Sequence, residues 1–110
     1  MVRVINEQEF IELIKLNTEA KSSRPLVVDC FTEWCPPCKA SAPVYEKLSQ
    51  KYQGEADFVK INVDQNPGVA MRLRVQGVPT FVIIRGNKLV SKVVGADMRK
   101  LEKYIKNAIN

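Results

Sequence analysis

The spacing of apolar positions along the chain changes several times, and each change predicts a new element. Short apolar runs bounded by polar or turn residues are typical of β-strands. We expect five of them, at Val2–Ile5, Leu26–Thr32, Phe58–Val63, Thr80–Arg85 and Lys88–Val94. Glycine at the first position of the Gly86–Asn87 turn favours a type II′ hairpin between the last two.

Helical spacing and capping signals predict four helices between these strands. The first begins after Asn6, which forms a capping box with Glu9, and ends in the polar stretch Asn17–Pro25. The members of its apolar face are Phe10, Ile11, Leu13 and Ile14.

The second helix begins at Pro36 and ends near Gly54, and we expect Pro43 to kink it. Its apolar side is predicted at Val44, Leu48 and Tyr52.

The third helix begins with Asn66 as cap and Pro67 as first residue, and the fourth is capped by Asp97. Their inner faces are predicted at Val69, Ala70 and Leu73, and at Leu101, Ile105 and Ala108.

Strands that alternate with helices pair in parallel, whereas the hairpin adds antiparallel pairing. The pattern therefore predicts an α/β fold with a central mixed five-stranded sheet flanked by four helices. A chain of 110 residues has the size of one domain, so we expect residues 1–110 to form a single domain.

Composition adds expectations about location. Hydrophobic residues make up 45% of the chain and charged residues 26%, as in ordinary globular proteins. No apolar run approaches the roughly 20 residues of a membrane span. The start "MVRVINEQEF" lacks the apolar core of a secretory signal. We therefore expect a cytoplasmic protein without membrane contact.

The net charge of +5 is spread along the chain, with a mild excess of Lys and Arg from Arg72 onward. No run of five or six like charges occurs, and no basic stretch is interleaved with aromatic residues. These features argue against nucleic-acid binding and favour a solvated basic surface suited to acidic protein partners. We expect a monomer.

The chain has three cysteines and no histidine. An odd number excludes a complete disulfide framework. A structural zinc site usually needs four Cys or His ligands, so we expect no metal.

Two of the cysteines form the motif "WCPPC", Trp34 to Cys38, at the predicted junction of a strand and a helix. Cysteines three apart on a first helical turn lie side by side and can form a disulfide. The free N–H groups at a helix N-terminus stabilise a thiolate, which is the reactive form. We expect Cys35 to be the more exposed, to attack a substrate disulfide and to form a mixed disulfide. Cys38 then attacks Cys35 and releases the reduced substrate.

The chain resembles thioredoxins in four segments that have their order and spacing, over about residues 2–109. These are "VVDCFTEWCPPCK" (Val27–Lys39), "KINVDQNPG" (Lys60–Gly68), "VQGVPTF" (Val75–Phe81) and "VVGA" (Val93–Ala96). The resemblance implies the thioredoxin fold and the reduction of protein disulfides. It also implies that no cofactor is bound, and that electrons come from NADPH through a flavoprotein reductase.

The resemblance extends to single residues. Asp29 lies in an apolar run, where burial raises the pKa of a carboxyl group, and it matches the aspartate that takes the proton of the second thiol. Lys60 matches the lysine beside that aspartate. Val78–Pro79 matches a cis-proline loop whose backbone pairs with an extended substrate. The implied substrate-docking patch consists of Trp34, Pro36, Gly77, Val78, Pro79 and Ala96.

Cys30 follows Asp29 and therefore points to the opposite face of the strand. We interpret it as a small buried hydrophobic residue.

One residue departs from the usual thioredoxin pattern. Thioredoxins usually have glycine at the position of Pro36, whereas Pro37 is usual. WCPPC is typical of tryparedoxins and nucleoredoxins, so an alternative is a reductase of that kind, with a low-molecular-weight dithiol as electron donor. A disulfide oxidase or isomerase and a non-catalytic binding module are further alternatives. The absent export signal and the intact motif argue against these two.

We expect Pro36 and Pro37 to tune the reduction potential. Proline fixes φ and removes one N–H that faces the Cys35 sulfur. The variant Pro36→Gly should therefore change the potential measurably and leave the fold intact. Potentials of the two proteins in equilibrium with glutathione would check this, and equal values would contradict it.

Overall fold

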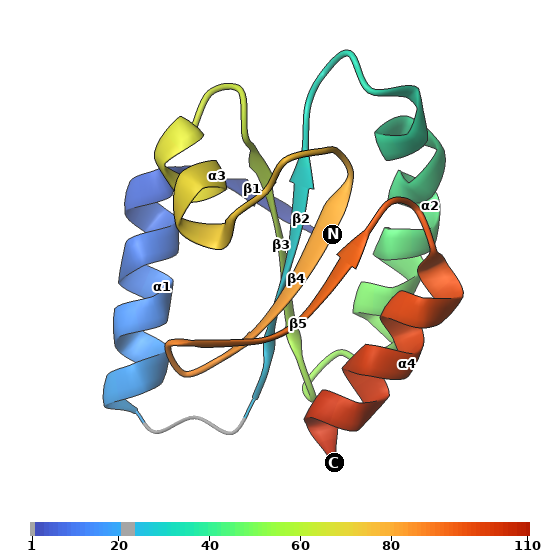
Figure 1. Ribbon diagram of the computed structural model, residues 1–110. Coiled ribbons are helices and arrows are strands. Elements are labelled where there is room, and N and C mark those ends of the chain that lie inside the picture. The colour runs from blue at the N-terminus through green and yellow to red at the C-terminus, as the bar shows by residue number, and fades with distance from the viewer. Residues whose placement is uncertain (1, 21–23) are drawn as a thin grey trace.

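The computed structural model describes residues 2–20 and 24–110, and within them it has three layers (Figure 1). The middle layer is a sheet of five strands in the order β1-β3-β2-β4-β5. Their bounds are β1 Arg3–Ile5, β2 Leu26–Phe31, β3 Asp57–Asn62, β4 Thr80–Arg85 and β5 Lys88–Val94. The helices are α1 Glu7–Glu19, α2 Pro36–Lys51, α3 Pro67–Leu73 and α4 Met98–Ile109. The predicted α/β fold with a mixed sheet is confirmed.

Strand β2 is the centre of the sheet. It pairs in parallel with β3 on one side and antiparallel with β4 on the other. Five of its six side chains are buried, which fits a strand covered on both faces. Helices α1 and α3 cover one face, as Phe10, Val69 and Leu73 show by packing in one core cluster. Helices α2 and α4 cover the other, and Tyr45 and Leu101 belong to that cluster.

The caps of α1 and α4 and the turn between β4 and β5 form as the sequence predicts. Asn6 and Glu9 form the capping box of α1, and the Asp97 side chain accepts a hydrogen bond from the N–H of Lys100 at the start of α4. Gly86 has a φ of +64°, and among the described non-glycine residues only Arg74 has a positive φ. The turn therefore has its positive φ at the first central residue alone, as in type II′.

One expectation about the helices is confirmed and two are wrong. Helix α1 ends at Glu19, within the polar stretch Asn17–Pro25 where its end is predicted. Lys21–Ser23 of the predicted polar stretch lie outside the described residues. Val44 of α2 is 40% exposed, and the residue after it, Tyr45, is fully buried. Leu48 and Tyr52 are buried as predicted, so Val44 alone is wrong in the predicted face, and Tyr45 is buried in its place.

The second correction concerns Asn66, whose side chain makes no capping hydrogen bond to α3. Its Oδ1 instead accepts the N–H of Glu7, the first residue of α1, at 2.9 Å. Its Nδ2 donates to the carbonyl of Asn62, also at 2.9 Å. Asn66 thus satisfies a free N–H of α1, a helix distant in sequence.

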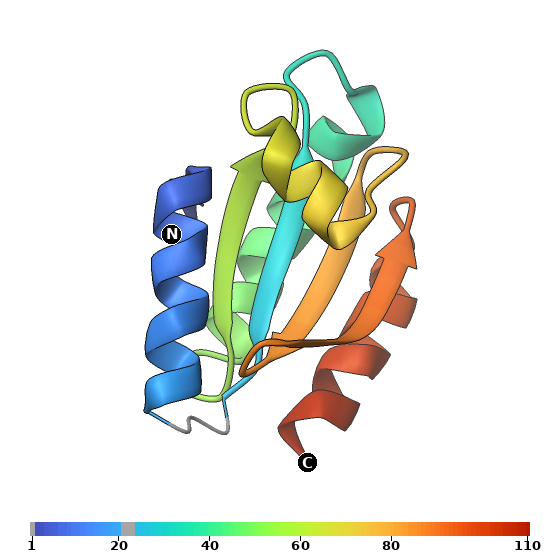
Figure 2. The same ribbon diagram turned by 60° about the vertical axis from the view of Figure 1, so that its left-hand side comes forward.

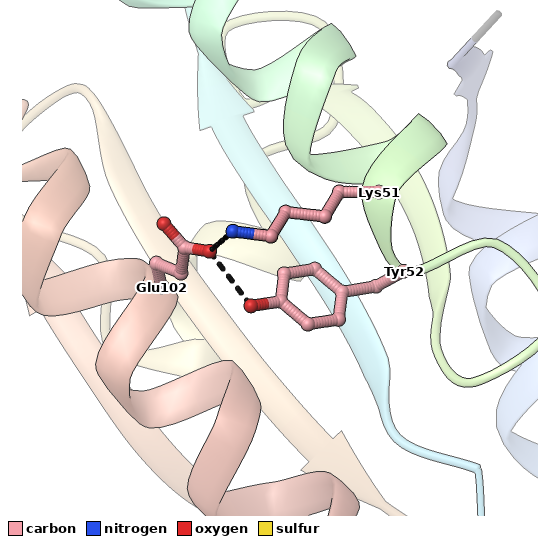
Figure 3. Close-up of polar contacts among 3 residues, drawn as sticks. All are labelled: Lys51, Tyr52 and Glu102. Atoms are coloured by element: carbon pink, nitrogen blue, oxygen red, sulfur yellow. Dashed lines mark hydrogen bonds and ion pairs between the residues drawn. The ribbon is translucent and has the colours of Figure 1, made fainter.

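Polar contacts join α2 to α4 at the end of the molecule away from the start of α2 (Figure 3). One carboxylate oxygen of Glu102 accepts from Lys51 Nζ at 2.6 Å and from the Tyr52 hydroxyl at 2.7 Å. These hydrogen bonds hold the pKa of Glu102 below its usual range. They fix the end of α2, whose other end carries the cysteines.

None of the helices that the structure describes is long and apolar enough to cross a bilayer.

Candidate active site

Cys35 and Cys38 form a disulfide at the junction between β2 and α2. Their Cα atoms are 5.2 Å apart, within the range of native disulfides. Cys35 is the N-cap of α2, and its sulfur accepts the N–H of Cys38 at 3.1 Å. The helix N-terminus therefore faces the sulfur of Cys35, a position that favours a negatively charged sulfur over a neutral thiol.

The two prolines determine which backbone N–H groups at the start of α2 can donate hydrogen bonds. Pro36 and Pro37 are the first two residues of α2, so neither position has an N–H. The N–H of Cys38 comes next and binds the Cys35 sulfur, whereas the N–H of Lys39 binds the Cys35 carbonyl. One donor thus remains for the sulfur, as the sequence predicts.

The predicted difference in exposure between the two cysteines is wrong for the disulfide form. Cys35 is 2% exposed and Cys38 is 5% exposed. The physical reason is that the bond holds both sulfurs in the junction, flanked by the exposed Trp34, Pro36 and Pro37. The two cysteines differ in hydrogen bonding, because within the described residues only the Cys35 sulfur accepts an N–H, that of Cys38. They do not differ in the way that the predicted exposure requires.

Asp29 lies beneath this helix start, on the face of the sheet that α2 and α4 cover. It is opposite Phe81, which belongs to the core cluster of that face. The side chain is 1% exposed, and neither of its oxygens has a hydrogen-bond partner among the described residues. Burial raises its pKa from 3.8 to about 6, and the charge of Lys60 opposes part of this rise. The expected raised pKa is confirmed.

Lys60 is placed beside Asp29 by the register between β2 and β3, in which the two residues are partners. Its Nζ lies 4.9 Å from the centre of the Phe31 ring. Lys60 also lines a pocket of about 170 Å³ together with Cys38 and Thr32. The structure therefore brings Lys60 close to both the buried carboxyl group and the second cysteine.

The loop before β4 carries the predicted cis peptide bond between Val78 and Pro79. The Thr80 hydroxyl donates to the Gly77 carbonyl at 2.6 Å, and the Gly95 N–H donates to the Pro79 carbonyl at 2.8 Å. The second bond places Ala96, the next residue along the chain, beside this loop.

A groove of about 270 Å³ joins three residues of the predicted docking patch, Trp34, Gly77 and Val78. Trp34 is 69% exposed, and its indole N–H donates to a carboxylate oxygen of Asp64 at 2.7 Å. The other three members, Pro36, Pro79 and Ala96, do not line this groove, and Pro79 is buried. Pro36 adjoins Cys35, and Ala96 adjoins the loop through Gly95.

Two residues of the site were missed in the sequence. Asp64 orients Trp34, and Thr32 lines both pockets with a buried hydroxyl that has no partner among the described residues. Asp64 lies in the "KINVDQNPG" segment, but nothing local pairs it with a tryptophan 30 positions earlier. Cys30 is buried on the opposite face, as predicted, and burial raises its pKa to about 12.

The described part of the chain holds no group of three or more Cys, His, Asp or Glu side chains arranged to bind a metal ion.

Comparison with known proteins identifies the family. The Thioredoxin family model matches residues 1–107. The chain belongs to the thioredoxin family. It is 39% identical over 89 residues to a thioredoxin of Synechocystis sp., covering 76% of this chain and 83% of that protein. It is 41% identical over 101 residues to thioredoxin AMT13 of Alternaria alternata, covering 92% and 80%.

Solved structures agree. The short form of thioredoxin f from spinach chloroplast superposes with a TM-score of 0.90 at 37% identity, covering 99% of this chain and 94% of that one. Thioredoxins are dithiol–disulfide oxidoreductases that carry no cofactor, and the bonded Cys35–Cys38 pair fits this chemistry. This protein is therefore a thiol–disulfide oxidoreductase that reduces protein disulfides. The alternatives based on tryparedoxins or on a disulfide oxidase are not favoured.

The burial of Asp29 predicts a pH-dependent cost to stability. Because the folded pKa of about 6 lies above the unfolded value of 3.8, the folded state binds more protons between these values and loses stability as the pH rises through them. Two pKa units correspond to about 3 kcal/mol. Asp29→Asn should therefore raise the free energy of unfolding at neutral pH by about this amount, and by almost nothing below roughly pH 4.

Urea unfolding of the disulfide form across this pH range measures the difference. Glu19→Gln, which removes an exposed carboxyl group at the end of α1, is the matched control and should change little at any pH. If Asp29→Asn raised the free energy of unfolding equally in acid and at neutral pH, the ionisation of Asp29 would not be the cause of the lower stability.

Proposed function

We propose that this thioredoxin uses Cys35 as the attacking thiol and Cys38 as the resolving thiol. The observation that carries this assignment is the hydrogen bond from the Cys38 N–H to the Cys35 sulfur at the start of α2. In the reduced protein the same donor stabilises a thiolate on Cys35. The described residues offer Cys38 no equivalent donor, so its thiol keeps its proton until a base removes it.

The reaction proceeds in two exchanges. The Cys35 thiolate attacks one sulfur of a target disulfide, forms a mixed disulfide and displaces the other target sulfur as a thiolate, which takes up a proton. The Cys38 thiolate then attacks Cys35, which forms the Cys35–Cys38 disulfide and releases the second target thiol. The target gains two electrons and two protons, and the protein loses them.

Asp29 is the proposed base for the second exchange. With a pKa of about 6, its carboxyl group is mostly ionised at neutral pH and is a stronger base than an exposed aspartate. Lys60 lies beside it in the register and shares a pocket with Cys38. In this proposal, the Cys38 proton passes to Asp29 at this pocket, and Lys60 moderates the basicity of the carboxylate.

The target segment binds across the docking patch beside the disulfide. Two features support this placement. The groove at Trp34, Gly77 and Val78 opens next to the cysteines, and Asp64 holds the exposed indole in place. In our proposal the Val78 backbone pairs with an extended target segment, while Pro36, Pro79 and Ala96 supply apolar contact.

We further propose that electrons reach the disulfide from NADPH through a flavoprotein thioredoxin reductase, and that the protein acts as a cytoplasmic monomer. The similarity to thioredoxins supports the reductase. A low-molecular-weight dithiol is the alternative donor that WCPPC suggests. The proposed effect of Pro36 and Pro37 on the potential rests on the single donor left to the Cys35 sulfur.

The assignment of the two thiols predicts different outcomes for two variants. Cys35→Ser should reduce insulin no faster than dithiothreitol alone, because the attacking thiolate is lost. Cys38→Ser should also turn over poorly but should accumulate mixed disulfides with its targets, because nothing resolves them. Cys30→Ala, on the other face of the sheet, is the control and should keep full activity. Mixed disulfides trapped on Cys38 in Cys35→Ser would reverse the assignment.

The proposed electron donor predicts the outcome of a turnover assay. NADPH with a thioredoxin reductase should sustain many cycles of insulin reduction, whereas glutathione at the same reducing capacity should sustain few. Oxidation of NADPH at 340 nm follows the first reaction. The opposite order of rates would assign the protein to a dithiol-dependent pathway instead.

A further inference from the structure

The charges of the chain are divided unevenly along its length. From Arg72 to the C-terminus nine residues are Lys or Arg, and two are acidic, Asp97 and Glu102. Glu102 is bound to Lys51, and Asp97 caps α4. The last third of the chain forms the loop before β4, the hairpin of β4 and β5, and α4. The excess positive charge therefore lies on these C-terminal elements and on the end of α3.

Strand β5 and the end of α3 lead toward the active site. Strand β5 is the last strand of the sheet, and it runs toward the end where the cis-proline loop and the start of α2 lie (Figure 1). Figure 2 shows the C-terminal end of α3 beside the start of β4, next to β5. The chain passes from α3 into the loop and later returns along β5, so both segments border the docking patch.

Arg74 and Lys92 come together at this border. Arg74 ends α3 in the left-handed conformation, with φ 55° and ψ 49°. Its carbonyl oxygen accepts a hydrogen bond from Lys92 Nζ at 2.9 Å. A non-glycine residue in this conformation is uncommon, and here it turns the chain into the loop that carries Pro79. The two side chains are cationic, and neither makes an ion pair with an acidic residue in the described part of the chain.

An apolar residue separates these cations from the cis-proline. Lys92 pairs with Val82 and Val94 pairs with Thr80, so Lys92 and Val94 project from the same face of β5. Val94 is 70% exposed. It precedes Gly95, whose N–H binds the Pro79 carbonyl. We define the Arg74–Lys92 surface as Arg74, Lys92 and Val94.

We propose that the Arg74–Lys92 surface binds an acidic segment of the target protein, next to the disulfide under attack. This inference rests on the proposed function, because it specifies which disulfide proteins the site prefers. Unpaired cations beside a docking site favour acidic partners and speed their encounter. Asp64 lines the groove beside Trp34, and its carboxylate repels acidic residues there. The acidic part of the target therefore lies on the β5 side, with apolar contact to Val94.

Matched peptide substrates test this proposal. One peptide carries a disulfide flanked by Asp and Glu residues, and its control carries Asn and Gln at the same positions. With the native protein and dithiothreitol, kcat/KM at about 0.01 M salt should favour the acidic peptide by roughly 3–10-fold. The preference should fall toward one at about 1 M salt, where the screening length is about 3 Å.

Three double variants locate the effect. Arg74→Gln with Lys92→Gln should lower the ratio of the two kcat/KM values toward one. Arg74→Lys with Lys92→Arg keeps both charges and should keep the ratio, which separates charge from a change in the loop. Lys15→Gln with Lys47→Gln removes two exposed cations from α1 and α2 and lowers the net charge by the same amount. This variant should also keep the ratio of the two kcat/KM values.

The outcomes are distinct. Reduction of both peptides at equal rates would overturn the inference and leave the proposed function intact. An equal fall in the ratio for the Lys15 and Lys47 variant would also overturn it, because total charge would then be the cause. Salt-sensitive binding of duplex DNA without a peptide preference would assign the surface to nucleic acid. Failure to reduce either peptide or insulin would overturn the proposed function and the inference together.

Discussion

The position of β2 at the centre of the sheet is the constraint on which the site depends. Pairing with β3 places Lys60 beside Asp29, and pairing with β4 places Phe81 on its other side. Because both faces of β2 are covered, the carboxyl group of Asp29 is buried and its pKa rises. The strand then ends at Phe31, and within a few residues α2 begins with its N-terminus around Cys35. One strand thus positions the proposed base, its counter-charge and the proposed attacking sulfur.

The surroundings of Cys35 and of Asp29 favour opposite charge states. The start of α2 favours a charged sulfur on Cys35, since the Cys38 N–H points at it. The interior beneath it disfavours a charged Asp29, since neither carboxylate oxygen has a partner among the described residues. In the proposed mechanism, the first effect makes Cys35 the nucleophile and the second makes Asp29 the base. The charge on Asp29 destabilises the fold, as expected where function and stability conflict.

Most of the fold could be predicted because its signals are local. The capping box at Asn6, the Gly86–Asn87 turn and the apolar runs specify elements within a few residues of themselves, and all of these formed as expected. The errors share a cause. The burial of Tyr45 in place of Val44 and the bonding of Asn66 to α1 both depend on what packs against a helix. Periodicity and capping preferences carry no information about that neighbour.

The sequence by itself determined the chemistry: a cysteine pair on a first helical turn, a carboxyl group in an apolar strand, and prolines that leave one donor for a sulfur. Each of these depends on residue type and on spacing of a few positions, so it can be read without coordinates. Only the tertiary structure decided which distant groups meet. Asp64 binds the indole of Trp34, which lies 30 residues earlier in the chain. Lys92 on β5 binds the carbonyl of Arg74 at the end of α3. Such contacts follow from strand register and helix packing, which bring together side chains that no local pattern relates.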